Sequence, residues 1–327
     1  MFTNLLELIK SMPDEQTCRN YIAEQRWGAG KVVCPYCEHN KAYVIEDGKR
    51  YKCTSKTCHK KFSVTVGTFM EASNIPLTKW LTGIYLVTAH KKGISSYQLG
   101  RDLGIAQKNS WFMLHRIREV LKPQYDGLMT GTIEADETYM ARKYKSDFKG
   151  LPPEEVEYKL NSKTDGKGAV LGMVERSTGT VRVLAFANNN RDNITQAVRA
   201  NVEKGSKLHT DESYLYRALE QDYYRETVVH GRKEWVRQSI VSGKVHTNNV
   251  ENFWGVMKRG VHGIYHQISF KHLQAYCNEY AFRYNTRKIK DSDRFVLSLG
   301  NLHGRLTYKA LISEKESNNH NTATNNG

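Results

Sequence analysis

The spacing of apolar residues divides the chain into a helical first part and a mixed second part. Between residues 76 and 122 the apolar positions follow a helical period, with Leu77, Trp80 and Leu81 on one face. From Thr132 onward, short alternating stretches typical of strands are separated by stretches with helical spacing. The pattern therefore predicts an α/β domain that follows a helical region.

The second part has a predicted order of strand, hairpin, helix, strand, short helix, strand and helix. The ranges are 132–137, 169–175 with 181–187, 193–204, 207–210, 214–221, 227–230, and a helix near 249 that Asn248 or Asn249 can cap. A polar insertion at 143–167 is expected to be a mobile loop or a short helix. The tail at 313–327 is rich in Asn, Ser and Thr and is expected to be disordered.

Within the first part, the pattern fits a helix-turn-helix. A short helix starts at Ser95, a turn falls at Gly104, and a second helix follows. An ordinary pair of antiparallel helices would give the same pattern. If the motif binds DNA, residues at the start of the second helix would reach base edges or phosphates, namely Gln107, Lys108, Asn109 and Ser110.

The charge of the chain changes this picture by indicating a partner. The 327 residues contain 49 Lys and Arg against 34 Asp and Glu, which gives a formal charge of +15 and a pI near 9.4. Such a balance favours a polyanion such as double-stranded DNA, although a basic protein without a polyanionic partner would look alike. The sequence shows neither a run of about 18 apolar residues nor a secretory leader. We therefore expect no membrane association and a cytoplasmic location.

Four of the six cysteines form two close pairs. The ligand set Cys34, Cys37, Cys53 and Cys58, with two short predicted strands between the pairs, is typical of a zinc ribbon with a structural ion. His59 is an alternative to Cys58, and disulfides would be the alternative in a secreted protein. The other two thiols, Cys18 and Cys277, lie in amphipathic stretches and are expected to be packed in the core.

Three acidic segments lie far apart in the sequence. Glu134 and Asp136 share one face of the predicted strand at 132–137, Asp211 ends the strand at 207–210, and Glu251 lies at the start of a predicted helix. Carboxylates brought together from such elements can hold hard divalent cations such as Mg²⁺. Two ions ~3.5–4 Å apart can activate a nucleophile and stabilise the leaving oxygen of a phosphodiester. The sequence thus predicts a metal-dependent enzyme that acts on nucleic acid.

These motifs, in this order, resemble the zinc-ribbon DDE transposases of bacterial insertion sequences, the ISXO-two-like group of superfamily fifteen ninety-five. The resemblance rests on the four cysteines, on Asp136 to Tyr139, on His209 to Asp211, and on His246 to Gly260. It implies a ribonuclease H-like catalytic domain, two catalytic Mg²⁺ ions for which Mn²⁺ can substitute, and strand transfer of element ends into target DNA.

The resemblance also implies roles for individual residues. Asp136 and Asp211 match the first two acids of the family, and Glu251 is the expected third, with Asn248 and Asn252 as alternatives. Lys258 lies seven residues after Glu251, on the same helix face, where it would meet a DNA phosphate. Arg259, beside it, is a further candidate for DNA binding, although both could belong to a solvated face.

The expected domains are a helical segment at 1–30, a zinc ribbon at 31–70, a helix-turn-helix region at 71–128 and a ribonuclease H-like domain at 129–312. The expected partners are terminal repeats and target DNA, bound by a homo-oligomer. Two other functions share these features. A DNA-binding regulator would have the same first part on an inactive core, and a nuclease or resolving enzyme would hydrolyse DNA without joining it.

Overall fold

The computed structural model describes residues 2–28, 30–45, 48–143, 148–162 and 166–313. Its contacts divide the chain into two compact units, the first formed by 1–121 with 289–327 and the second by 122–288. No helix among the described residues is long and apolar enough to cross a membrane. The expected tail lies outside the described residues from 314 onward, as do 144–147 and 163–165 of the polar insertion.

The first unit begins with two helices and a small sheet. Asn4 and Asp14 accept hydrogen bonds from backbone amides of the first turns and so start the helices, as short polar side chains commonly do. The small sheet is antiparallel in the order β1-β2-β3, so it contains the two strands expected between the cysteine pairs and one more. The elements are α1 (Leu5–Ser11), α2 (Glu15–Trp27), β1 (Ala42–Ile45), β2 (Arg50–Cys53) and β3 (Lys61–Phe62).

The rest of the first unit is helical. Ser95 caps the first helix of the expected pair, and Gly104 ends it in the left-handed conformation, which agrees with the predicted helix start at Ser95 and turn at Gly104. The helices are α3 (Leu77–Ala89), α4 (Ser96–Leu103), α5 (Gln107–Val120), α10 (Asp291–Leu299) and α11 (Tyr308–Ile312). Phe295 of α10 lies 5.3 Å from Phe2 and 6.2 Å from Tyr85, ring centre to ring centre. Because of this packing, residues 289–313 group with the first unit, whereas the sequence prediction assigned 289–312 to the domain at 129–312 and 313 to the tail.

The second unit is organised around one five-stranded sheet. The strands are β4 (Thr132–Arg142), β5 (Lys167–Glu175), β6 (Val181–Phe186), β7 (Lys207–Thr210) and β8 (Tyr224–Thr227). Their order across the sheet is β6-β5-β4-β7-β8, so β4 is central. β5 runs antiparallel to its neighbours β4 and β6, whereas β7 runs parallel to β4 and β8 parallel to β7. The long strand β4 thus pairs both with β5 of the β5–β6 hairpin and with β7, the strand that precedes Asp211.

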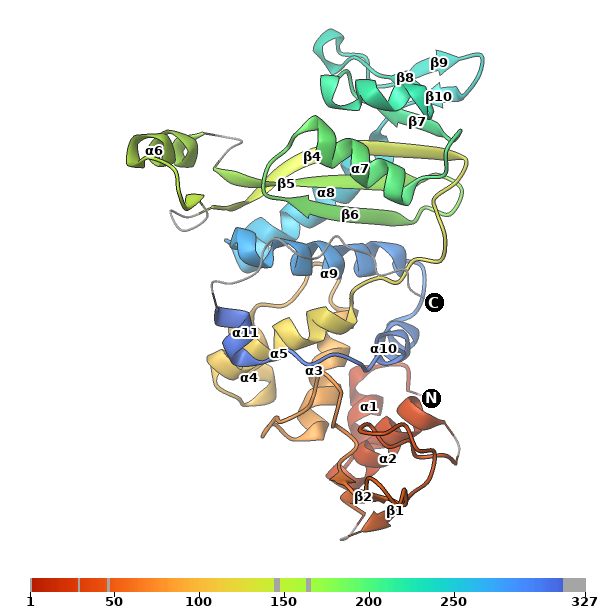
Figure 1. Ribbon diagram of the computed structural model, residues 1–327, viewed down its shortest axis with the longest axis vertical. Helices are drawn as coiled ribbons and strands as arrows, with labels where there is room; N and C mark the ends of the chain where they lie inside the picture. The colour runs from red at the N-terminus through yellow and green to blue at the C-terminus, as the bar shows by residue number, and fades with distance from the viewer. Residues whose placement is uncertain (1, 29, 46–47, 144–147, 163–165, 314–327) are drawn as a thin grey trace. The chain divides into compact units, whose positions relative to one another are not determined.

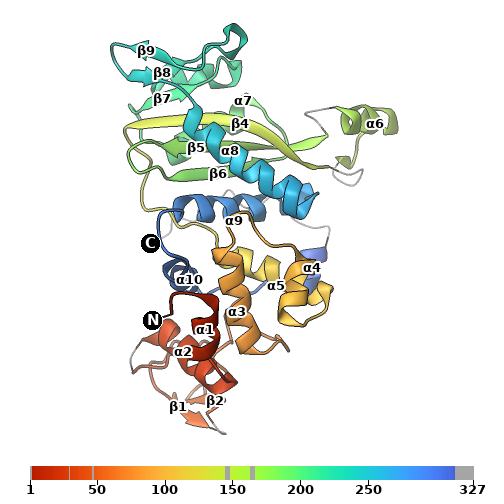
Figure 2. The same cartoon turned by 180° about the vertical axis from the view of Figure 1, so that it is seen from behind.

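Helices cover the two faces of this sheet separately. In Figure 1, α7 (Arg191–Asn201) lies in front of the sheet, and in Figure 2, the view from behind, α8 (Asn248–Gly260) does. One apolar core joins Ile133 and Ala135 to α7 and to the turns of η2 (Tyr214–Gln221). The other joins α8 and α9 (Leu273–Asn285) to the opposite face of β5 and β6. Alternate residues of β4 therefore face different helices, as the strand period requires.

Two features of this unit differ from the sequence prediction. The strand expected at 227–230 is β8, which ends at Thr227, because its pairing with β7 ends at Thr210 and Val228 is already buried beyond it. A two-stranded hairpin, β9 (Arg237–Ser239) with β10 (Gly243–Val245), was not predicted. The remaining elements are α6 (Pro153–Asn161) within the polar insertion, η3 (His230–Arg232), the π-helical turn η4 (Val261–Tyr265) and η5 (Phe270–His272).

Candidate active site

The four cysteines converge at one point of the first unit. Sγ of Cys34 lies 3.8 Å from that of Cys58, and Sγ of Cys37 lies 3.6 Å from that of Cys53. All four sulfurs lie within 4.8 Å of one another. Four Zn–S bonds of ~2.3 Å arranged as a tetrahedron would place the sulfurs about 3.8 Å apart. The cluster therefore fits a structural zinc ion, with Cys58 rather than His59 as the fourth member.

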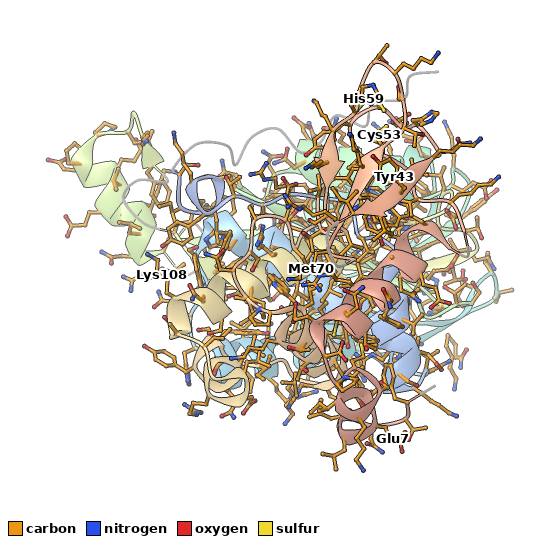
Figure 3. All side chains as sticks on the ribbon, turned by 90° about the horizontal axis from the view of Figure 1, so that it is seen from below. Glu7, Tyr43, Cys53, His59, Met70 and Lys108 are labelled. Atoms are coloured by element: carbon orange, nitrogen blue, oxygen red, sulfur yellow. The ribbon has the colours of Figure 1, made fainter. Side chains whose placement is uncertain are left out.

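Each cysteine pair lies on a tight turn that the backbone conformation supports. The residue after the second cysteine has a positive φ in both turns, 58° at Glu38 and 49° at His59. These conformations reverse the chain so that both thiols of a pair face the same point. Figure 3 labels Cys53, at the end of β2, and His59, in the turn between β2 and β3. The other two thiols, Cys18 and Cys277, are fully buried and lie outside the cluster.

A second group of possible ligands lies at the centre of the second unit. Asp136 and Glu137 are adjacent on β4, and Asp211 follows the end of β7, which pairs in parallel with β4. One carboxylate oxygen from each of the three lies within 4.8 Å of the others. Asp136 faces α8, where the indole Nε1 of Trp254 donates to its Oδ2 at 2.9 Å. The hydroxyl of Tyr216, in η2, donates to Oε2 of Glu137 at 2.6 Å.

Burial and mutual repulsion make these acids easy to protonate. Burial raises the pKa of Asp136 to about 6, and the charge of Asp211 adds to the effect. Burial likewise raises the pKa of Glu137 to about 7, against the opposing hydrogen bond from Tyr216. The pKa of Asp211 is also raised by burial. A cation bound among the three would offset this repulsion, because it stabilises their charged forms.

The donor set of this cluster suits a hard divalent cation. All three side chains offer oxygen, which Mg²⁺ and Mn²⁺ prefer, and Asp136 and Asp211 approach from different elements. Oε1 of Glu137 is buried and makes no hydrogen bond of normal geometry to any described residue. An orphaned buried carboxylate oxygen is costly unless a ligand or ion satisfies it. The cluster therefore fits the metal that the sequence predicted, with Glu137 as a member that the prediction lacked.

Glu251 lies near this cluster but outside the group of three. Its Oε1 accepts a hydrogen bond of 2.7 Å from the hydroxyl of Thr247 and lies 3.5 Å from Nε2 of His230. Its charge contributes to the raised pKa of Asp136. The side chain of Glu251 is 39% exposed and is therefore accessible to a ligand. The alternative ligands Asn248 and Asn252 are exposed as well, so exposure does not distinguish the three residues. Its role as third ligand stays a prediction.

Several residues near the acids had no role in the sequence prediction. Trp254 packs in the core, and its indole also orients Asp136. Gly172 pairs with Asp136 across the sheet, and a Cβ there would lie 2.6 Å from the ring of Trp254. A glycine that interrupts the apolar run of β5 was the sequence signal that could have indicated this close approach of a helix. No sequence signal distinguished His230.

The start of α8 also differs from the expectation. Thr247 is the N-cap, and Asn248 is the first residue of the helix, so the prediction that Asn248 or Asn249 caps it is wrong. The Asn249 side chain instead donates to Oε1 of Glu134 at 2.7 Å. The expected common face of Glu134 and Asp136 is confirmed, because both carboxylates bind residues of α8.

The candidate DNA-binding residues lie on exposed surfaces within their own units, except Ser110, which is fully buried and donates to the backbone carbonyl of Ser96 at 2.7 Å, so it cannot reach DNA as predicted. Gln107, Lys108 and Asn109 begin α5 and are exposed, with the ammonium of Lys108 lying 4.8 Å from the ring centre of Tyr308. Figure 3 labels Lys108 well away from Cys53 of the zinc cluster. Lys258 and Arg259 are exposed in the last turn of α8, two turns beyond Glu251.

Comparisons with known proteins give matches for both units. The family model of the ISXO2-like transposase domain matches residues 128–285, and that of the transposase zinc-ribbon domain matches 13–61. No protein with a curated description matches the chain. A cryo-EM structure of the simian T-cell lymphotropic virus intasome in complex with the PP2A regulatory subunit B56 gamma matches at 13% identity and a TM-score of 0.26. That match covers 57% of this chain and 63%, less than two thirds, of the other.

Proposed function

The chain belongs to the zinc-ribbon DDE transposases of the IS1595 family, and from this premise we propose that it catalyses both chemical steps of transposition. In the first step, water attacks a phosphodiester at the element end and leaves a free 3′-hydroxyl. In the second step, that hydroxyl attacks a phosphodiester of target DNA, so one P–O bond forms as another breaks. The enzyme forms no covalent intermediate and is a DDE-type polynucleotidyl transferase.

The observation that carries this proposal is the meeting of Asp136 with Asp211. The two aspartates come from distant segments, and their oxygens lie within 4.8 Å of one another and of Glu137. Burial raises the pKa of both aspartates, and the charge of Asp211 raises that of Asp136 further. Such crowding destabilises a fold unless the charges serve a ligand. A cation between them is the simplest ligand that does so.

The order of elements supports a ribonuclease H-like domain. A long first strand, a hairpin, a helix, two parallel strands and a later helix follow one another around the central β4. The first acid lies on that first strand, the second follows the fourth strand, and Glu251 lies on the later helix. This is the arrangement that the sequence resemblance implied for the domain at 129–312.

Each residue of the site has a distinct task in this scheme. Asp136, Asp211 and Glu251 would hold two Mg²⁺ ions, or Mn²⁺ in their place. When bound, such ions lower the pKa of the attacking water and stabilise the leaving oxygen. Trp254 keeps the Asp136 carboxylate oriented through its 2.9 Å hydrogen bond. Lys258 contacts a phosphate of the bound strand, and Arg259 extends that contact along α8. Catalysis rests on positioning and charge stabilisation.

Recognition of DNA is assigned to the first unit. The zinc ribbon and the helix pair α4–α5 would bind the terminal repeats, with Gln107, Lys108 and Asn109 facing the DNA. The formal charge of +15 favours binding to phosphates. Because two element ends must be joined to one target, we expect a homo-oligomer on DNA. The substrate implies that the protein works at the bacterial nucleoid.

The test is a cleavage and joining assay on labelled DNA taken from the ends of the element that carries the gene. With Mg²⁺ we expect nicked and joined products, and without added divalent cation or in Asp136→Ala we expect neither, while end binding persists. Cleavage without joining would favour a nuclease or resolving enzyme. Binding without cleavage in the unmodified protein would favour a DNA-binding regulator.

A further inference from the structure

One buried carboxylate links the central strand to the helix that bears Glu251. Glu134, on β4, is fully buried. Its Oε2 accepts the backbone amides of Asn249 at 2.8 Å and Val250 at 3.3 Å, and its Oε1 accepts the Asn249 side chain. These partners form the first turn of α8, which is more than a hundred residues away in the sequence.

Two cationic or polar side chains complete the surroundings of Glu134. Arg176 donates from Nε to Oε1 of Glu134 at 2.6 Å, and Nδ1 of His246 lies 3.2 Å from the same oxygen. The guanidinium of Arg176 also donates to the backbone carbonyls of Lys244 and His246. The chain leading into α8 is thereby bound to the same centre as the helix itself.

Glu134 acts as a helix cap supplied from a distant strand. The first amides of a helix have no partner within the helix, and a side chain at the N-cap normally satisfies one of them. The N-cap residue Thr247 does not do so, since its hydroxyl donates to Glu251. A carboxylate at a helix N-terminus also interacts favourably with the helix dipole. The start of α8 therefore depends on Glu134.

A second hydrogen bond between β4 and α8 fixes the direction of the helix. Trp254, one turn further along α8, donates to Asp136, which lies two residues beyond Glu134 on the same face of β4. Two residues of a strand span ~7 Å, and four or five residues of a helix span ~6–7.5 Å. The hydrogen bonds of Glu134 and of Asp136 to α8 are thus matched in spacing, and together they hold the helix along the strand. Glu251 lies between them.

We propose that Glu134 is a positioning residue that sets α8 on β4, so that Glu251 faces the site of Asp136 and Asp211. The inference rests on the proposed function, because it assigns Glu251 a metal-binding task. Glu134 contacts neither metal nor DNA in this scheme. Its effect passes through the backbone of Asn249 and Val250 to the neighbouring Glu251.

The first test is amide hydrogen exchange of the whole, zinc-loaded chain with Glu134→Gln. Glutamine keeps the shape of the side chain but loses the charge and presents an NH₂ group to the amide donors. We expect faster exchange, by about tenfold or more, at the amides of 249–251. The matched control is Glu279→Gln, which removes another buried carboxylate, bound to Arg283 at 2.6 Å and to the hydroxyl of Tyr265 at 2.7 Å. The control should lower the melting temperature without affecting those amides.

The second test measures binding of Mn²⁺ alone by electron paramagnetic resonance. Residues that orient metal ligands typically change metal affinity by about 10–100-fold when replaced. We expect Glu134→Gln and Glu251→Gln each to weaken Mn²⁺ binding by about tenfold or more, and Glu279→Gln to leave it within about twofold. The combined variant of Glu134→Gln and Glu251→Gln should bind as weakly as Glu251→Gln alone, because the first change acts through the second residue.

The outcomes separate the two claims. A further loss in the combined variant, unchanged exchange at 249–251, or unchanged Mn²⁺ binding in Glu134→Gln would each overturn the positioning role. If unmodified protein bound no Mn²⁺, or Glu251→Gln bound it normally, the proposed metal site itself would be wrong. The exchange experiment needs no added metal, so it tests the contact between Glu134 and the start of α8 whether or not the proposed metal site is right.

Discussion

The four cysteines of the ribbon and the acids of the second unit are gathered in different ways. The cysteines all lie between residues 34 and 58, on two turns of a small sheet. The acids come from a central strand, from the end of its parallel neighbour and, for Glu251, from a distant helix. The first group needs only local structure, whereas the second requires the whole unit to fold.

The two groups also differ in whether they leave a binding position open. Four thiolates complete the coordination of a zinc ion and leave no position for a substrate. The acidic group has a buried oxygen of Glu137 with no hydrogen bond to the described residues, and Glu251 beside it is partly exposed. A closed group serves stability, and an incomplete one leaves room for a substrate. The comparison makes five predictions.

The largest effect is expected at the ribbon. Cys34→Ser removes one of four zinc ligands, and structural zinc contributes about 10–16 kcal/mol of apparent binding energy in small domains. We expect loss of zinc, measured by elemental analysis, and rapid amide exchange in β1 to β3. Exchange in residues 122–288 should not change. Cys18→Ala is the control, since this buried thiol lies outside the cluster. Equal unfolding of both units would contradict the comparison.

The next effect concerns catalysis without loss of structure. Asp211→Asn should reduce nicking of element-end DNA by about 10³-fold or more, or ~4 kcal/mol, because one proposed metal ligand loses its charge. Zinc content and DNA binding should stay normal. Asp222→Asn removes a carboxylate that pairs with Arg199 at 2.7 Å and Lys204 at 2.8 Å in the same unit, and should leave nicking within about twofold. A nicking rate retained in Asp211→Asn would exclude this aspartate from the site.

A smaller effect is expected where α8 packs on the sheet. A Cβ at Gly172 would lie 2.6 Å from Trp254 and 3.0 Å from Val250. Gly172→Ala should therefore cost about 1–3 kcal/mol of stability, measured by urea unfolding, and weaken Mn²⁺ binding by displacing the indole from Asp136. Gly263→Ala is the control, since a Cβ there meets nothing within 4 Å. Equal stability of the two variants would show that the helix tolerates displacement.

The smallest effect is a dependence of stability on pH. In the folded chain the pKa of Asp136 is about 6 and that of Glu137 about 7, both above the ordinary values of 3.8 and 4.5. Folding therefore favours their neutral forms, and their contribution to stability is lost as pH rises from about 4 through 7. Without metal, Asp136→Asn should raise the free energy of unfolding at pH 8 by about 1–3 kcal/mol.

The same groups predict how metal binding depends on pH. Mn²⁺ binds the deprotonated carboxylates, so its affinity should rise between pH 5 and pH 8 by up to about tenfold per pH unit for each proton released. Calorimetric titration at several pH values measures this. An affinity that is constant over this range would mean that the acids are already charged at pH 5. The zinc content of the protein should stay constant between pH 6 and pH 8.

Local features of the molecule were predictable from the sequence, and contacts between distant segments were not. The cysteine spacing, the start of a helix at Ser95 and the turn at Gly104 depend on neighbouring residues, and the structure confirms them. The common face of Glu134 and Asp136 followed from the strand period. The binding of Glu134 to the start of α8 joins residues more than a hundred positions apart, and no local pattern indicates it.

The misplaced elements have similar causes. The strand at 224–227 is polar and the hydrophobic pair Val228 and Val229 follows it, so hydropathy shifted the prediction toward the valines. The sequence prediction gave Glu137 no role, because its contact with Tyr216 joins segments 79 residues apart on the other face of the sheet. Residues 289–313 had no signal that they pack with α3, since that contact depends on Phe2 and Tyr85.

Anomalous X-ray scattering from crystals of the whole chain soaked in Mn²⁺ tests the central claim most directly. The difference between data collected just above and just below the zinc edge should show one peak, among the four sulfurs of Cys34, Cys37, Cys53 and Cys58. Data at the manganese edge should show density between Asp136 and Asp211, within reach of Glu251, and no such density in Asp211→Asn. Manganese absent from these carboxylates, or bound only at other acids, would contradict the proposed site.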